Sequence, residues 1–155
     1  ADKPYYRLAG DQLEFLDSAL VIPGEGVHKM GYVFATKAVD PTNWFYPCHF
    51  YNDPVMPGSL GVEAILQAMK LFVLQQDIGK DLTSPYFTHL PGITKWLYRG
   101  QITPDNEVMD LEVHIKAIEQ SGDQINVVAD ANLWKNKLRI YQVNDIALVL
   151  KGATV

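Results

Sequence analysis

Three side chains able to take part in acid–base or nucleophilic chemistry lie close together in this 155-residue sequence. Cys48, the only cysteine, precedes His49, and Glu63 follows that histidine by fourteen positions. An imidazole, with an unperturbed pKa of about 6.5, can accept a proton near neutral pH. A carboxylic acid can donate one if an apolar environment keeps it protonated. These residue types suit either a thiol nucleophile or a base and an acid.

A thiol nucleophile fits the local spacing poorly. Neighbouring residues in an extended chain point to opposite sides, so His49 is badly placed to take a proton from Cys48. We expect Cys48 to be a small buried hydrophobic residue instead. Of the other histidines, His114 is predicted to lie on the surface, and His28 and His89 near loops without a recognisable partner.

The element that must position the acid is predicted to be a buried helix over residues 59–76. Apolar residues recur there at intervals of three and four, as expected for a helix packed inside a domain. These residues are Ile65, Ala68, Met69 and Phe72. Pro57 and Gly58 interrupt any earlier continuation of the helix, and Ser59 is the expected N-cap. His49 then lies in the loop that leads into the helix.

Glu63 shares one side of this helix with Gln67 and Lys70, at i+4 and i+7. Periodicity alone favours a polar stripe that faces solvent, with the acid near the positive end of the helix. His49, taken alone, is also typical of an ordinary loop histidine. The residues by themselves therefore leave both a structural and a catalytic role open.

Strands are predicted on both sides of the helix, because short alternating or apolar runs lie between turn signals. Two precede the helix, and four follow it after a loop near residues 86–92. The predicted strands are 13–22, 28–40, 93–102, 108–118, 124–134 and 138–150. Short polar turns between the last four predict an antiparallel meander. One curved antiparallel sheet around a single central helix, the α+β hot-dog fold, satisfies this order, and its uncovered edge and face predict pairing with a second copy.

The composition is typical of one soluble globular domain spanning residues 1–155, with 48% hydrophobic and 20% charged residues. The net charge is −5 and no basic cluster is present, which argues against nucleic acid as a partner. No apolar run approaches the ~18 residues of a membrane span. A single cysteine fits a reducing, cytoplasmic compartment. Motifs for zinc, dinucleotides and nucleoside triphosphates are missing from the sequence.

The string HFYNDPVMPGSLGVEAILQ, residues 49–67, resembles the motif of bacterial β-hydroxyacyl-carrier-protein dehydratases, including the β-hydroxydecanoyl dehydratase/isomerase. The pattern is most similar to the dehydratase domains of polyunsaturated fatty acid synthases. His49, the DPVMPG turn at 53–58 and Glu63 occupy the family's positions in register. WF at 44–45 and RGQITP at 99–104 also match family features, and the similarity spans roughly residues 13 to 150.

This resemblance implies dehydration of β-hydroxyacyl thioesters to trans-2-enoyl thioesters in fatty acid or polyunsaturated fatty acid synthesis. The acyl group would arrive on the phosphopantetheine arm of an acyl carrier protein, and no metal or redox cofactor is required. His49 would be the base, Glu63 the acid, the Gly58 N–H an oxyanion donor, and Gln67 an orienting, substrate-binding group. The family pattern implies that base and acid meet across a homodimer interface or between two tandem hot-dog halves.

Two departures from the family pattern narrow the expected activity. Glu63 replaces the aspartate of the decanoyl enzyme, and Asn52 stands where glycine is common. Both argue against double-bond isomerisation but not against dehydration. Two alternatives stay open, an acyl thioesterase of hot-dog fold and a non-catalytic partner half of a tandem dehydratase. Because the sequence begins ADKPYYRLAG rather than with methionine, a free-standing protein and a domain excised from a larger multidomain synthase also both stay open.

Overall fold

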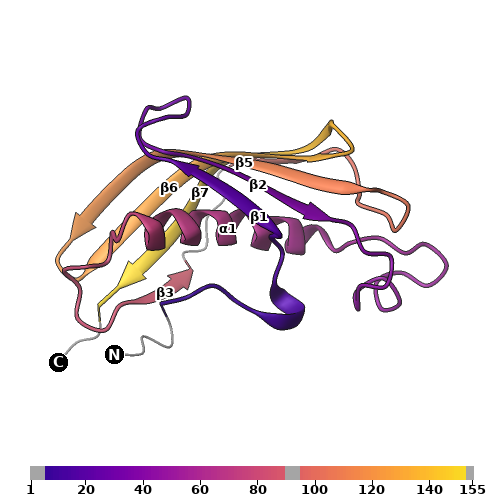
Figure 1. Cartoon of the computed structure of the whole chain (residues 1–155), viewed down its shortest axis with the longest axis horizontal. Coiled ribbons are helices and arrows are strands. Elements are labelled where there is room, and N and C mark those ends of the chain that lie inside the picture. The colour runs from indigo at the N-terminus through magenta and orange to yellow at the C-terminus, as the bar shows by residue number, and fades with distance from the viewer. Residues whose placement is uncertain (1–5, 90–94, 153–155) are drawn as a thin grey trace.

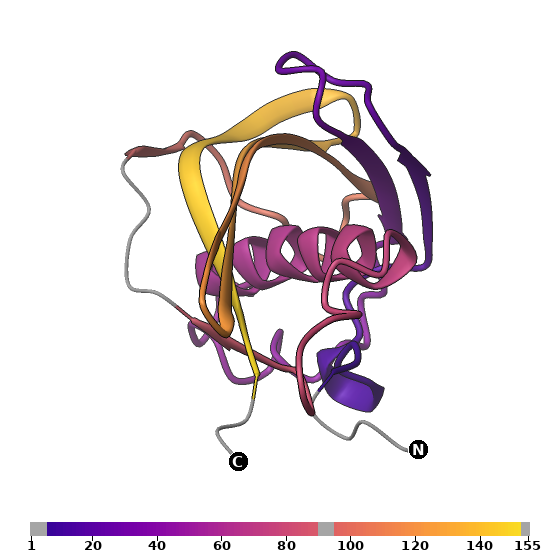
Figure 2. The same ribbon diagram turned by 90° about the vertical axis from the view of Figure 1, so that its left-hand side faces the viewer.

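The computed structural model describes residues 6–89 and 95–152. In this part of the chain a long helix, α1 (Gly58–Gln75), lies against a strongly curved antiparallel sheet of seven strands (Figure 1). The strands are β1 (Ser18–Ile22), β2 (Tyr32–Ala38), β3 (Tyr86–His89), β4 (Lys95–Tyr98), β5 (Val108–Ser121), β6 (Gln124–Lys135) and β7 (Leu138–Lys151). A short 3-10 helix, Asp11–Leu13, precedes β1. Figure 2 shows the sheet curling around α1, which confirms the predicted hot-dog fold.

The order of the strands across the sheet is β1-β2-β5-β6-β7, and both β3 and β4 pair with the outer edge of β7. β4 lies opposite Tyr141–Asn144, whereas β3 lies opposite Leu148–Lys151. The predicted meander is therefore confirmed for β5, β6 and β7 but is wrong for β4. β4 crosses over to β7, and β5 pairs with β2 instead.

Three other predictions of strand positions need correction. β3 forms where a loop was predicted, because a four-residue strand is defined by its pairing with β7 rather than by its own pattern. β1 covers only the second half of the predicted strand 13–22, since Leu13 ends a 3-10 helix and residues 14–17 are not in a strand. β2 begins at Tyr32 rather than at residue 28, because residues 26–29 form a turn, in which Lys29 has positive φ, and Gly31 after it also has positive φ.

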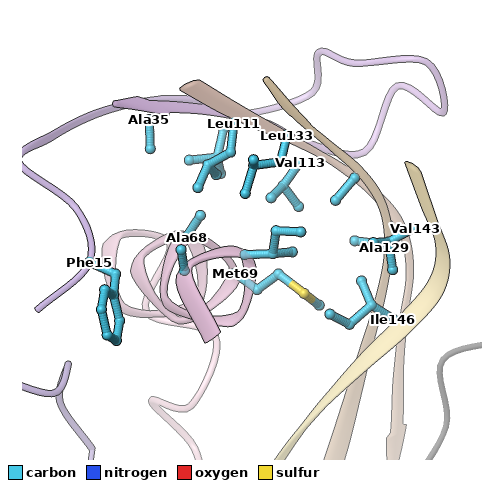
Figure 3. Close-up of a cluster of buried hydrophobic side chains, with 14 of the residues drawn as sticks. Phe15, Ala35, Ala68, Met69, Leu111, Val113, Ala129, Leu133, Val143 and Ile146 are labelled. Carbon is cyan, nitrogen blue, oxygen red and sulfur yellow. The ribbon is translucent and has the colours of Figure 1, made fainter. Parts of the chain in front are cut away.

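Alternation along the long strands builds the core. Every second residue is buried on the side that faces α1 from Met109 to Ile115 in β5 and from Ile125 to Leu133 in β6, as period-two side-chain geometry requires. Figure 3 shows Ala68 and Met69 of α1 pointing toward this apolar surface, which includes Leu111 and Val113 of β5 and continues to Ile146 of β7. Burial of a valine, leucine, isoleucine or methionine side chain contributes about 1.5–3 kcal/mol. Hydrophobic burial therefore holds α1 inside the curl of the sheet.

The start of α1 differs from the prediction. The helix begins at Gly58 and its N-cap is Pro57, so the expected N-cap residue, Ser59, already lies in the first turn. No side chain caps this end of the helix. The first N–H groups of a helix have no intrahelical acceptor. The helix therefore presents backbone donors to whatever lies in front of it.

Candidate active site

The loop that carries His49 is anchored in the core at both ends. Phe45 and Tyr46 are buried, and the His49 backbone N–H donates to the Phe45 carbonyl at 2.9 Å. At the other end Val55 and Met56 are buried. The Met56 N–H also donates to the carbonyl of Ile102 at 2.8 Å. A loop fixed in this way can hold a side chain in one orientation.

A hydrogen bond orients the imidazole of His49. Its Nδ1 lies 3.0 Å from the carbonyl oxygen of Val55. A carbonyl oxygen can only accept, so Nδ1 must carry the proton. In the neutral ring Nε2 then keeps its lone pair, which is the arrangement required of a general base.

Two unusual backbone conformations shape the turn between His49 and Val55. Phe50 and Asn52 both have φ of 65°. Asparagine tolerates this left-handed region better than most residues, which explains how it stands where the family pattern commonly has glycine. A bulky residue such as Phe50 adopts it at a cost of about 1–2 kcal/mol. The loop therefore stores local strain beside the candidate base.

Glu63 lies in the second turn of α1 and is oriented by Gln67. The Gln67 side chain is 2% exposed, and its Nε2 donates to the Leu13 carbonyl at 2.6 Å and to Glu63 Oε1 at 3.3 Å. Its Oε1 accepts from the Phe15 N–H at 3.0 Å. Gln67 is thus buried rather than solvent-facing, and it links the N-terminal segment to the candidate acid.

His49 and Glu63 each have their own partner within the described chain. His49 contacts Val55 and Glu63 contacts Gln67, and no hydrogen bond or ion pair joins the two candidates between residues 6 and 152 as far as these are described. In Figure 1 the loop before α1 extends beyond the start of the helix. One copy of the chain therefore holds both groups without joining them, and their meeting across two hot-dog units stays a prediction.

Gly58 starts the helix and contacts aromatic side chains. A methyl group on Gly58 would lie 3.2 Å from Cε2 of Tyr98 and 3.4 Å from Cη2 of Trp96. The Tyr141 hydroxyl donates to the Gly58 carbonyl at 3.2 Å. This aromatic cluster was not predicted from the sequence. The signal available was the pair Gly58 and Gly61, because two glycines one turn apart allow another group to approach the helix backbone.

Cys48 is exposed, so the prediction of a buried residue is wrong. It lies in the turn that follows the buried Phe45 and Tyr46, and its Sγ donates to the Trp44 carbonyl at 3.3 Å. The two aromatic residues, rather than the cysteine, fill the core at this position. Cys48 therefore does not contribute to the packing that holds the loop.

Two of the remaining histidines bind the loop between β1 and β2 to the outer face of the sheet. His28 Nε2 lies 2.9 Å from Asp130 Oδ2, so the prediction that His28 has no partner is wrong. The side chain of His114 is 12% exposed and is covered by this loop, whose Val27 N–H donates to His114 Nδ1 at 3.1 Å. The predicted surface position of His114 is therefore wrong. His89 lies in β3, and its side chain is outside the described residues.

The described residues contain no group of three or more histidine, cysteine, aspartate or glutamate side chains able to hold a metal ion. The only long helix among them, α1, is not apolar enough to cross a membrane. The arrangement at the start of α1 can bind an oxyanion, because free N–H groups and the positive end of the helix dipole lie there.

Comparison with known proteins links this geometry to a family. The chain is 46% identical over 138 residues to one of the polyunsaturated fatty acid synthase subunits of Thraustochytrium sp. (strain ATCC 26185 / S-3). The match covers 88% of the chain but only 9% of that relative's length.

Solved structures of similar fold include the dehydratase heterocomplex ApeI:P from Xenorhabdus doucetiae, with a TM-score of 0.62 and 12% identity over 98% of this chain and 91% of that chain. A point mutant of the fluoroacetyl-CoA-specific thioesterase FlK has a TM-score of 0.50 and 12% identity over 76% of this chain and 82% of that chain. At these identities the two structures support the hot-dog fold alone. A family model described as a FabA-like domain matches residues 8–144, and the chain therefore belongs to the FabA-like domain family.

Proposed function

We propose that this domain dehydrates β-hydroxyacyl thioesters to trans-2-enoyl thioesters, with the acyl group delivered by an acyl carrier protein. The observation that carries the proposal is the hydrogen bond from His49 Nδ1 to the Val55 carbonyl, which leaves Nε2 as a base. Membership of the FabA-like family and the similarity to part of a polyunsaturated fatty acid synthase support the substrate class.

In the proposed reaction, His49 Nε2 removes the proton from the carbon next to the thioester carbonyl. Charge that develops on the carbonyl oxygen is stabilised by the Gly58 N–H at the positive end of α1. The bond between the β-carbon and its hydroxyl then breaks, and Glu63 protonates the departing group so that it leaves as water. Gln67 keeps the Glu63 carboxyl in position through its Nε2.

We expect His49 of one hot-dog unit to act together with the acid of a second unit. The second unit would be either the other copy of a homodimer or a tandem neighbour. This arrangement is supported by the absence of a contact between His49 and Glu63 within the described part of one chain. It is also supported by the size of the relative, of which this chain matches only 9%. Retention of both residues argues against a non-catalytic partner half.

Replacement of His49 by alanine, or of Glu63 by glutamine, tests the proposal. Loss of a general base or acid costs about 10²–10⁴-fold, so hydration of crotonyl-CoA should become barely measurable in both variants. Circular dichroism should stay unchanged, because neither side chain belongs to the buried core. Turnover near the wild-type rate in both variants would contradict the assignment.

The same assay separates dehydration from the thioesterase alternative. A dehydratase changes the absorbance of the enoyl thioester without releasing free thiol, whereas a thioesterase releases coenzyme A. Thiol release by the wild-type domain at a rate equal to or above its hydration rate would favour the thioesterase. Measuring both activities against protein concentration would also show whether two copies are required.

A further inference from the structure

An aromatic cluster to which the proposed reaction gives no role lies against the first turn of α1. Its members are Trp96 and Tyr98 on β4 and Tyr141 on β7. The ring centroids of Trp96 and Tyr98 lie 5.6 Å and 5.1 Å from that of Tyr141. Tyr141 is 2% exposed, while the two β4 rings are partly open to solvent. The cluster therefore covers the start of the helix with one buried ring and two outer rings.

Glycine at position 61 is what allows Tyr141 to lie on the helix. A methyl group on Gly61 would lie 2.5 Å from Tyr141 Cε2 and 2.8 Å from its hydroxyl oxygen. Both distances are below 3.0 Å, a separation that Cβ atoms in folded proteins essentially never show. The Tyr141 ring thus contacts the helix backbone directly at its first turn.

The Tyr141 hydroxyl has a defined target, since it donates to the Gly58 carbonyl at 3.2 Å. Burial raises the pKa of Tyr141, and the neighbouring Tyr98 phenol adds to this effect. The hydroxyl is protonated at neutral pH even at the ordinary pKa of about 10, so it can donate. A phenylalanine ring would fill the same space. Packing alone therefore does not explain why this position carries a hydroxyl.

The carbonyl of Gly58 and the N–H of Ser59 belong to the same peptide group. A hydrogen bond accepted by the carbonyl polarises that group, and it strengthens the N–H as a donor by about 10–30%. The Ser59 N–H lies in the first helical turn and has no intrahelical acceptor. Tyr141 therefore acts on a donor at the end of the helix where the thioester oxygen is expected.

We propose that Tyr141 is a positioning residue for this site, whose hydroxyl orients and polarises the Gly58–Ser59 peptide toward the thioester oxygen. The inference rests on the proposed dehydratase function. It adds the Ser59 N–H as a donor beside the Gly58 N–H. The role proposed for Tyr141 also explains the two glycines at positions 58 and 61, because they let a phenol from β7 contact the start of the helix.

The test is Tyr141→Phe, which keeps the ring and removes the hydroxyl. The kcat for crotonyl-CoA hydration should fall about three- to tenfold, with KM within about twofold of wild type, because the donors act mainly on charge in the transition state. The amide proton resonance of Ser59 should also move upfield in nuclear magnetic resonance spectra, since its peptide group becomes less polarised.

Tyr32→Phe is the matched control. Tyr32 donates to Glu112 on the opposite face of the sheet, and its loss should leave kcat unchanged.

A second variant disrupts the same Tyr141–Gly58 hydrogen bond through a change in the helix. Gly61→Ala must displace the Tyr141 ring, so it should lower kcat to a similar extent, and the double variant with Tyr141→Phe should lose little more. An unchanged kcat in Tyr141→Phe, or an equal loss in Tyr32→Phe, would refute the role of Tyr141. Inactivity toward all β-hydroxyacyl and enoyl thioesters of the wild-type domain paired with a second hot-dog unit, as a homodimer or with its tandem neighbour, would instead refute the dehydratase function, and with it the catalytic part of this inference.

Discussion

His49 and His114 both connect a loop to the body of the domain, but their ring nitrogens are used differently. His114 accepts from the Val27 N–H at Nδ1, and its Nε2 lies 3.2 Å from Glu112 Oε1. His49 has a partner at Nδ1 only, the Val55 carbonyl. Among the described residues, none forms a hydrogen bond with its Nε2.

The surroundings of the two histidines differ in the same way. Glu112, beside His114, also accepts from the Tyr32 hydroxyl at 3.0 Å and from Asn132 Nδ2 at 3.0 Å. This outer-face network satisfies its own donors and acceptors. The network around α1 leaves the Gly58 and Ser59 N–H groups and Nε2 of His49 available, while the Leu60 N–H donates to the Pro57 carbonyl at 2.9 Å. A polar network completed by the chain itself stabilises the fold, whereas one with free positions can bind and transform a ligand.

The largest effect on stability is expected for Gln67, which belongs to the network around α1 and is also buried. Gln67→Ala would leave the Leu13 carbonyl and the Phe15 N–H without partners, so the free energy of unfolding should fall by about 2–4 kcal/mol. Glu63 would also lose its orienting donor, and kcat for crotonyl-CoA hydration should fall about tenfold. Urea denaturation and the hydration assay measure the two effects.

Gln67→Met is the matched control, because it fills similar volume without hydrogen bonds. It should recover part of the stability lost in Gln67→Ala but none of the activity. If the methionine variant were as active as the wild type, Gln67 would belong with the structural residues, and the distinction between the two networks would fail at this position.

A smaller effect of a different kind is expected for His114→Ala. Loss of the imidazole removes the acceptor of the Val27 N–H and one neighbour of Glu112, so the free energy of unfolding should fall by about 1–2 kcal/mol. For a domain of this size that corresponds to a decrease in Tm of about 2–8 °C. The kcat should not change, in contrast to His49→Ala. A loss of kcat in His114→Ala without a change in Tm would reverse the roles assigned to the two histidines.

The sequence predicts a helix or strand well where its position is set by the apolar spacing and the turn residues within that segment. The buried helix is found within one residue at each end, since its apolar spacing and the preceding Pro57 act together. The paired strands β5, β6 and β7 are found for the same reason. β3 and the crossover of β4 are missed, because both depend on which edge of β7 is free rather than on a pattern within the strand itself.

For the candidate site, the spacing of His49 and Glu63 identifies the residues but not their surroundings. The Val55 carbonyl, the Leu13 carbonyl and the Phe15 N–H are backbone groups, and no side-chain pattern indicates them. Tyr141 lies 83 positions from its partner Gly58, and only the folded sheet brings the two together. The sequence therefore indicates which groups could react, while the fold determines their hydrogen bonds.

The smallest effect is expected for Asp130, the acid on the outer face of the sheet that binds His28. Although burial opposes ionisation, the hydrogen bonds from His28 and from the Asp145 backbone, together with Lys116, hold the pKa of Asp130 below its ordinary value. A carboxyl with a lowered folded pKa stabilises the fold above the ordinary value of about 3.9 and loses that contribution as the pH falls through the folded value.

Asp130→Asn should therefore be less stable than the wild type at neutral pH, and the difference should shrink as the pH falls below about 4. Urea unfolding at a series of pH values measures this difference, and kcat at neutral pH should be unaffected.

Lys116→Met is a useful control, because Lys116 lies 2.7 Å from Asp145 and 3.5 Å from Asp130. Its loss therefore weakens the same network without removing the carboxylate. A stability difference between Asp130→Asn and the wild type that stays constant through the acid range would show that Asp130 acts by shape and not by charge. The outer-face network would then stabilise the β1–β2 loop through neutral hydrogen bonds, as His114 does with Val27.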